Sequence, residues 1–287
     1  MRIFPRFHHW NLVVLGLLFV TMTGCRVWNR THVTSAGTLA SRQYVQQAAR
    51  SLEQNNEEDA EVQLSEALDS NPANTEARVM MAEILWKKGK QKEATAEMER
   101  VAASVEAAPE HVTRLAQMYF DQGNFQDAQK WVSTSFRFND SLSATWVLQG
   151  EIYEKQARNE DALASYHQAA FYAPEDSKIQ LKIASIYLRI GKPQRALETA
   201  QNARLKGLAE DASAEMLLCE SKALAELNRS TDARRLLMIA YQKDPENTEI
   251  QTALAQLQPI QSPTLVDPET RYGSEIKILP KPEKTDH

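Results

Sequence analysis

The stretch WVLQGEIYEKQARNEDALASYHQAAFYAP, residues 146–174, places small and large side chains at regular intervals. Gly150 and Tyr153 lie three apart in its first half, and Ala162 and Ala169 lie seven apart in its second half. Residues that are three, four or seven apart share one face of an α-helix. The stretch therefore predicts two amphipathic helices joined by a turn.

The same arrangement recurs along the chain with a period of 34 residues. If residue 143 is position 1 of a repeat, position 8 is Gly, Ala or Ser in six consecutive copies, and the last copy follows after 37 residues. Position 20 is alanine in every copy: Ala60, Ala94, Ala128, Ala162, Ala196 and Ala233. An internal period of this length indicates an array of repeated structural units.

The small residues have a physical purpose, because two helices approach closely only where neither carries a bulky side chain. Within one repeat, we expect Gly150 and Ala162 to make that close contact, and Ala116 and Ala128 to make it in the preceding repeat. Ala169 is expected to let the first helix of the next repeat settle alongside. These five residues are the predicted repeat-packing positions.

The pattern resembles the tetratricopeptide repeat (TPR), a 34-residue pair of antiparallel helices. The resemblance covers residues 41 to about 258 and implies an all-α fold, a right-handed superhelical solenoid of six helix-turn-helix repeats with a capping helix. The expected elements are 41–74, 75–108, 109–142, 143–176, 177–213, 214–247 and the cap 248–258. Gly89, Gly123 and Gly191 all fall at position 15, the turn between paired helices, where a positive φ favours glycine.

The N-terminal residues 1–24 are expected to be a signal peptide. Two arginines precede an apolar run, Leu12–Val20, which is about half the ~20 residues that a membrane-spanning helix needs. The residues that follow, ending in Cys25, resemble the lipobox of bacterial lipoproteins, in which the cysteine is diacylated. An ordinary signal peptide and an uncleaved anchor are the alternatives.

Residues 25–40 are then the lipidated cysteine and a flexible tether. An Asp after the cysteine often signals retention in the inner membrane of such lipoproteins, and Arg26 stands there instead. We therefore expect a periplasm-facing protein, anchored by lipid to the outer rather than the inner membrane. The Pro-rich residues 259–287 are predicted to be a disordered tail.

No pattern for catalysis or for cofactor binding is found in the sequence. Glycine-rich phosphate loops, HExxH and GxSxG are absent, and His111 and His167 have no ligand cluster around them. A net charge of −5 disfavours nucleic-acid binding. We expect a non-enzyme without metal, cofactor or small-molecule substrate, in which Cys219 is a small apolar filler rather than a reactive thiol.

Partner binding is expected on the concave side of the solenoid. In TPR arrays the first helices line a groove through positions 2, 5, 9, 12 and 13, and here position 5 is almost always apolar. The predicted groove residues are Val79, Trp86, Lys87, Thr113, Phe120, Val147, Lys155, Leu181, Leu188 and Arg189. Alternatively, the apolar ones only pack against neighbouring helices.

These features together favour a scaffold of the bacterial cell envelope that binds peptides or helices of other envelope proteins. Lipoproteins that resemble this layout act in pilus, secretion or outer-membrane assembly. A structural, self-assembling envelope protein is the alternative, and an enzyme is a more distant one.

Overall fold

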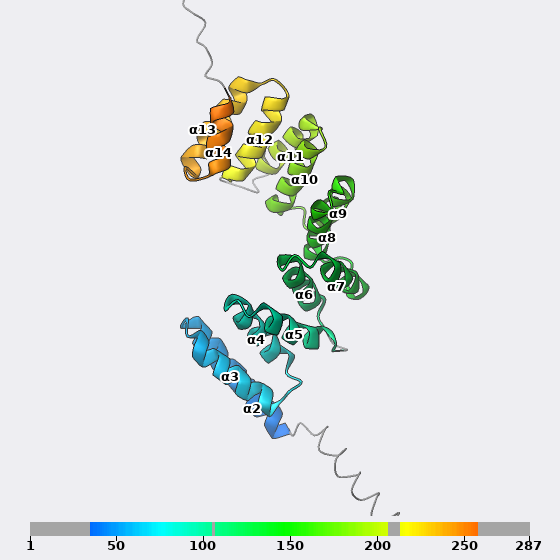
Figure 1. Cartoon of the computed structure of the whole chain (residues 1–287), viewed down its shortest axis with the longest axis vertical. Helices are drawn as coiled ribbons and strands as arrows, with labels where there is room; N and C mark the ends of the chain where they lie inside the picture. Colours follow the sequence, from blue (N-terminus) through cyan, green and yellow to red (C-terminus); the bar gives the residue numbers. More distant parts are fainter. Residues whose placement is uncertain (1–34, 105–106, 206–212, 258–287) are drawn as a thin grey trace, which may run out of the picture. The chain divides into compact units, whose positions relative to one another are not determined.

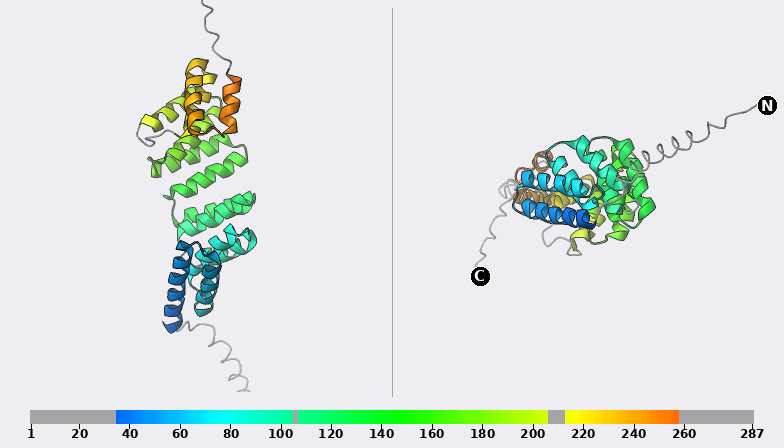
Figure 2. Two further views of the ribbon diagram at one scale, coloured as in Figure 1. Left: turned by 90° about the vertical axis from the view of Figure 1, so that its left-hand side faces the viewer. Right: turned by 90° about the horizontal axis from the view of Figure 1, so that it is seen from below.

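The computed structural model describes residues 35–104, 107–205 and 213–257, which form thirteen α-helices and no strand (Figure 1). The two further directions of view in Figure 2 show helical ribbons throughout these residues. The predicted all-α class and the stacking of consecutive helix pairs are confirmed. The predicted signal peptide, most of the tether and the predicted tail lie outside the described residues.

The chain divides into two compact units, residues 1–156 and 157–287. The first unit contains α2 (Ser35–Glu53), α3 (Glu57–Ser70), α4 (Thr75–Lys87), α5 (Gln91–Ala102), α6 (Pro109–Asp121), α7 (Phe125–Phe138) and α8 (Ser143–Lys155). The second contains α9 (Asn159–Tyr172), α10 (Ser177–Arg189), α11 (Pro193–Leu205), α12 (Ala214–Glu226), α13 (Ser230–Lys243) and α14 (Thr248–Gln256). Within each unit, every helix contacts the next one along the chain.

The helix starts follow the repeat. The helices α4, α6, α8, α10, α12 and α14 each begin at the first residue of a predicted element. The first helix differs, because α2 begins at Ser35, inside the segment predicted to be a tether that ends at residue 40. Residues 35–40 contain no proline that would exclude them from a helix.

A left-handed residue ends the first helix of every repeat. Gly89, Gly123 and Gly191 have φ between 68° and 76°, as their position predicts. The other three repeats place Asn55, Ala157 and Asn228 there, with φ of 57–60°. Five of the six turns share two backbone hydrogen bonds, as at Gly89, where Gly89 N–H donates to Trp86 O and Lys90 N–H donates to Leu85 O. This pair of bonds is the Schellman motif, which satisfies carbonyls at the helix end.

The close helix contacts are centred on alanine. All six alanines at position 20 are completely buried, and so are Ala116 and Ala169. In the first unit Ala116 and Ala128 share one cluster with Val132, Leu148 and Ile152, so that large side chains fill the space beside the small ones. Gly150 and Ala162 are both buried but belong to different units, and their mutual contact stays a prediction.

A cluster of three buried hydroxyls joins α6, α7 and α8 in the first unit. Thr113 Oγ1 lies 2.8 Å from both Ser135 Oγ and Thr145 Oγ1, and Ser135 Oγ also donates to Pro109 O at 3.3 Å. Because each hydroxyl has a partner in this cluster, the buried polar atoms are satisfied. The cluster fixes how three successive helices meet.

The turn residues generate a first prediction. Ala157→Gly is expected to raise the free energy of unfolding by about 0.5–1 kcal/mol, because a left-handed conformation strains alanine but not glycine. Gly123→Ala is expected to lower it by about 1 kcal/mol, although its new Cβ would meet no atom within 4 Å. Denaturant unfolding measures both changes. The matched control is Ala164→Gly on the exposed side of α9, where the same substitution should destabilise, and equal signs at Ala157 and Ala164 would contradict the argument.

The hydroxyl cluster generates a second prediction. Thr113→Val is expected to lower the free energy of unfolding by about 1–2 kcal/mol, because it leaves Ser135 and Thr145 short of a buried partner. Removing all three hydroxyls together, with Ser135→Ala and Thr145→Val, should cost less than the sum of the three single changes, since no orphaned partner remains. Strictly additive losses would refute this account. Ser133→Ala, which removes an exposed hydroxyl of α7, is the control.

Candidate functional site

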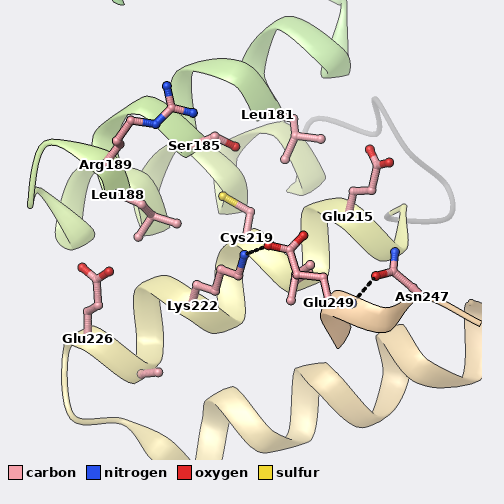
Figure 3. Close-up of a pocket in the computed structure, with 12 residues that line it drawn as sticks. Leu181, Ser185, Leu188, Arg189, Glu215, Cys219, Lys222, Glu226, Asn247 and Glu249 are labelled. Carbon is pink, nitrogen blue, oxygen red and sulfur yellow. Dashed lines mark hydrogen bonds and ion pairs between the residues drawn. The ribbon is translucent and has the colours of Figure 1, made fainter. Parts of the chain in front are cut away.

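A pocket of about 710 Å³ opens between α10, α12 and the start of α14 in the second unit (Figure 3). Its floor is apolar, with Leu181 and Leu188 from α10, and Leu218 from α12. Leu181 and Leu188 are half-buried, and they pack against a core cluster that includes Ala184 and Cys219. Both leucines therefore keep part of their apolar surface available to a ligand.

Helical periodicity explains why these residues meet. Leu181, Ser185 and Leu188 are four and three residues apart on α10, so they share one face. On α12, Leu218, Lys222 and Glu226 are each four residues apart, so they also share one face of their helix. Because α10 and α12 contact each other directly, the two faces form one surface.

Charged side chains form the rim of the pocket. The carboxylates are Glu215, Glu226 and Glu249, and the cations are Arg189 and Lys222. Lys222 forms an ion pair with Glu249, which joins α12 to α14 (Figure 3). Three carboxylates and two cations leave the rim with one net negative charge.

Asn247 fixes the start of α14, which forms the third side of the pocket. Its side-chain oxygen accepts hydrogen bonds from the backbone N–H groups of Glu249 at 3.1 Å and Ile250 at 3.2 Å, and so caps the N-terminus of α14. Ile250 is fully buried in a cluster with Leu218 and Leu237. The cap and this anchor together fix Glu249 at the rim.

Cys219 lies in the pocket wall but is not built as a nucleophile. Its side chain is 5% exposed, and burial raises the pKa of its thiol to about 11, although a hydrogen bond with Ser185 acts in the opposite direction. At neutral pH the group is therefore a thiol, whereas the thiolate is the reactive form. This environment agrees with a small apolar filler.

The predicted groove residues of the first unit mostly pack against its own core. Val79 and Trp86 lie beside one cluster, and Phe120 lies beside the next, where its ring meets Phe125 edge-on at 5.4 Å. The guanidinium of Arg114 lies over the Trp86 ring at 5.8 Å. Half-buried rings that already have neighbours are weaker candidates for ligand anchors than the pocket leucines.

Arg114 is itself fixed by Glu83. Its Nε donates to one carboxylate oxygen at 2.6 Å, and its second nitrogen donates to the other at 2.7 Å. The paired carboxylate raises the pKa of Arg114 further above its usual value. The planar two-bond contact holds the guanidinium in place over the indole ring of Trp86.

The remaining predicted groove residues differ in exposure. Thr113 is a correction: it is 7% exposed and belongs to the hydroxyl cluster, so it is a packing residue and not a groove residue. Val147 is half-buried, and Lys155 is exposed. Lys87 is exposed and lies 3.5 Å from a carboxylate oxygen of Glu57.

The pocket brings together only three of the predicted groove residues, Leu181, Leu188 and Arg189. Its other rim residues on α12 lie at positions 2, 9 and 13, which are groove positions by the same rule. The predicted groove does not include Glu249, because residues 248–258 are assigned to a cap, or Asn247, which is the last residue of the element before it. Counting Thr248 as position 1 of a further first helix would have placed Glu249 at position 2 of the groove.

Two features are absent from the described residues. No group of three or more His, Cys, Asp or Glu side chains in residues 35–104, 107–205 and 213–257 is arranged to hold a metal ion. Over the same ranges, no helix has the length and apolar character that crossing a membrane requires.

Solved structures of other proteins resemble this arrangement of helices. Pseudomonas aeruginosa PilF superposes with a TM-score of 0.65 at 16% identity, over 77% of this chain and 99% of its own. PilW, described as a widely conserved type IV pilus biogenesis factor, gives 0.64 at 16% identity over 75% and 98%. YrrB, described as a TPR protein with an unusual peptide-binding site, gives 0.52 at 14% identity over 66% and 96%. At these identities the likeness concerns the fold alone.

A comparison with curated protein sequences found no match. The model of one protein family, described as the tetratricopeptide repeat-like domain, matches residues 4–187. That match covers more than half of the chain, and the helix pairs, the left-handed turns and the buried alanines are the features that such repeats share. The protein belongs to the tetratricopeptide repeat-like family.

Proposed function

We propose that the protein is a non-catalytic scaffold, tethered to a membrane of the bacterial cell envelope, that binds peptide segments of other envelope proteins. The observation that carries this proposal is the pocket of the second unit, with its apolar floor and charged rim on first helices. TPR proteins in general serve as interaction scaffolds, and this pocket offers a binding surface within the described residues.

The chemistry of the pocket suits a peptide. Leucines on the floor can take up apolar side chains, while the rim charges can fix the direction and register of the bound segment. The volume of about 710 Å³ is in the range of ligand-binding clefts. A partner segment would therefore insert apolar side chains between α10 and α12.

The envelope location is supported by the sequence and by the structural relatives. The lipobox-like residues before Cys25 predict a lipid anchor, and Arg26 favours the outer membrane. Two of the similar structures, PilF and PilW, are by name or description pilus proteins. We therefore infer a role in the assembly of pili, secretion systems or the outer membrane.

The properties of two pocket residues support a non-catalytic role. The thiol of Cys219 has a raised pKa, and Lys222 is held in an ion pair with Glu249. Neither group is prepared to act as a nucleophile at neutral pH. The pocket is therefore suited to binding rather than to a reaction.

Self-assembly is a second candidate, favoured by apolar side chains on the second helices of the second unit. Phe171 of α9 is 75% exposed and Met238 of α13 is 53% exposed, and Tyr241 of α13 is also exposed. Such side chains could bury against another copy of the chain. The pocket remains the better candidate because it combines a concave shape with both apolar and charged groups.

The binding proposal predicts the effect of altering the pocket. A chain with Leu188→Gln and Arg189→Glu is expected to capture its partner about tenfold less than the unaltered chain, equivalent to about 1.4 kcal/mol. Both residues line the pocket, and neither is fully buried, so the helices should stay folded. The measurement is crosslinking in native envelopes followed by quantitative mass spectrometry, with circular dichroism as the check on folding.

Arg235→Glu is the matched control for this experiment, because Arg235 is an exposed arginine of α13 that does not line the pocket. Its captured proteins should be those of the unaltered chain. If the pocket variant and the control capture the same proteins in the same amounts, the pocket is not the binding site.

The predicted lipid anchor at Cys25 generates a prediction about where the protein is found in the cell. Cys25→Ser is expected to move the protein from the membrane fraction to the soluble fraction, because the thiol that would receive the lipid is gone. Fractionation followed by immunoblotting measures the shift. Cys219→Ala, at the only cysteine among the described residues, should leave the protein in the membrane fraction. Membrane retention of the Cys25 variant would contradict lipid anchoring.

A further inference from the structure

We propose that the pocket of the second unit is occupied by the C-terminal segment of the same chain, SEIKILPKPEK, residues 274–284. The segment would lie across the floor between α10 and α12, with Ile276 and Ile278 on the leucines and its lysines at the rim carboxylates. The inference rests on the proposed function, in that the pocket is taken to bind extended peptides. It adds the identity of one occupant.

The segment is connected to the wall of the pocket that it would fill. The helix α14 contributes Asn247 and Glu249 to the pocket, and the described chain ends one residue after this helix, at Leu257. A helix of nine residues is about 13 Å long, so Leu257 lies at a comparable distance from the rim. The 18 residues between Leu257 and Ile276, as an irregular chain, span roughly 23 Å. The segment can therefore reach the pocket of its own chain.

The apolar residues of the segment match the floor. In an extended chain alternate side chains point to the same side, so Ile276 and Ile278 would face the floor together. The floor offers them the half-buried Leu181 and Leu188 and the edge of Leu218. Burying two isoleucine side chains against leucine removes apolar surface from water on both partners.

The charges are complementary. The segment, residues 274–284, carries three lysines and two glutamates, which is a net charge of +1, in a chain whose net charge is −5. The rim of the pocket carries one net negative charge, to which Glu215 and Glu226 contribute. Lys277 lies between the two isoleucines and Lys281 lies three residues after Ile278, so that both long side chains can reach past the floor to the rim carboxylates.

The two prolines of the segment favour an extended ligand. Pro280 and Pro282 fix φ near −65° and push the residues before them away from the helical region. Each also removes one backbone N–H that would need a partner on binding. A segment of this kind loses less conformational entropy when it binds in an extended form.

Covalent connection makes modest affinity sufficient. A binding segment on a short linker has an effective concentration in the millimolar range. Occupancy by the chain's own segment therefore requires only weak intrinsic binding. A partner that uses the pocket must displace the segment, which would restrict binding to partners that fit better or are locally concentrated.

The test uses carbodiimide crosslinking, which joins a lysine to a carboxylate in direct contact. The full chain is purified in detergent as an equal mixture of ¹⁴N-labelled and ¹⁵N-labelled protein, without any partner. We expect crosslinks from Lys277 or Lys281 to Glu215, Glu226 or Glu249 in peptides of a single isotope. The Lys88–Glu61 ion pair of the first unit is the internal positive control.

Two matched variants test the apolar contact. Ile276→Asp with Ile278→Asp should reduce the pocket crosslinks about tenfold and leave the Lys88–Glu61 crosslink unchanged. Leu265→Asp with Val266→Asp makes the same kind of change outside the proposed segment and should leave the pocket crosslinks in place. All four positions lie outside the described helices, so the pocket itself is unaltered.

Three results would overturn the proposal: no crosslinks to the pocket, equally frequent crosslinks to Glu246 and Glu198 outside it, or an equal loss in both variants. Crosslinks in mixed-isotope pairs would also overturn it, because the segment would then belong to a second copy. Since no partner is present, such a failure refutes only self-occupancy. The partner-capture experiment tests the proposed function separately.

Discussion

The structure depends on the close approach of paired helices at an alanine. In each repeat the residue at position 20 is alanine with no exposed surface, and around Ala128 larger side chains fill the space beside it. A protein interior tolerates neither gaps nor excess volume, so the small residue sets the distance at which the two helices settle. That distance decides which side chains on the first helices face outward into a groove.

The turn at position 15 makes this packing possible along the chain. Each first helix ends at the same position of its repeat, so that the second helix can fold back at the same point. The left-handed residue provides that stop even where it is Asn55, Ala157 or Asn228 rather than glycine. The same backbone conformation therefore occurs with three residue types, which indicates that the position in the repeat decides it rather than the side chain.

Much of the fold was predictable because the repeat is a local pattern. The alanine period and the turn position determine where helices begin, and six predicted starts coincide with observed ones. The early start of α2 at Ser35 was not predictable from the repeat, because residues 35–40 come before the first position of the repeat pattern. The position of Thr113 was also missed. A residue at position 5 can face a groove or an adjacent helix, and only the meeting of α6, α7 and α8 decides which.

The site was predictable in part for the same reason. Leu181, Leu188 and Arg189 follow from helical spacing within α10, but the pocket also needs residues of α14, which is about 60 residues further along the chain. Packing that joins such distant segments leaves no local signal beyond the repeat register itself. The register does contain that signal, because it assigns Glu249 to a groove position once α14 is counted as a first helix.

The charged rim of the pocket contributes more to the choice of ligand than to the stability of the fold. The Lys222 and Glu249 side chains are 39% and 63% exposed, so their ion pair contributes little to folding. A ligand can therefore break or rearrange this pair without unfolding α14, whose position is fixed by Ile250 and by the Asn247 cap. Because exposed charges are screened by salt, they affect the approach and register of a peptide more than its residence time. The residence time is set by the leucine floor, so apolar side chains hold a bound segment while its lysines decide whether it enters.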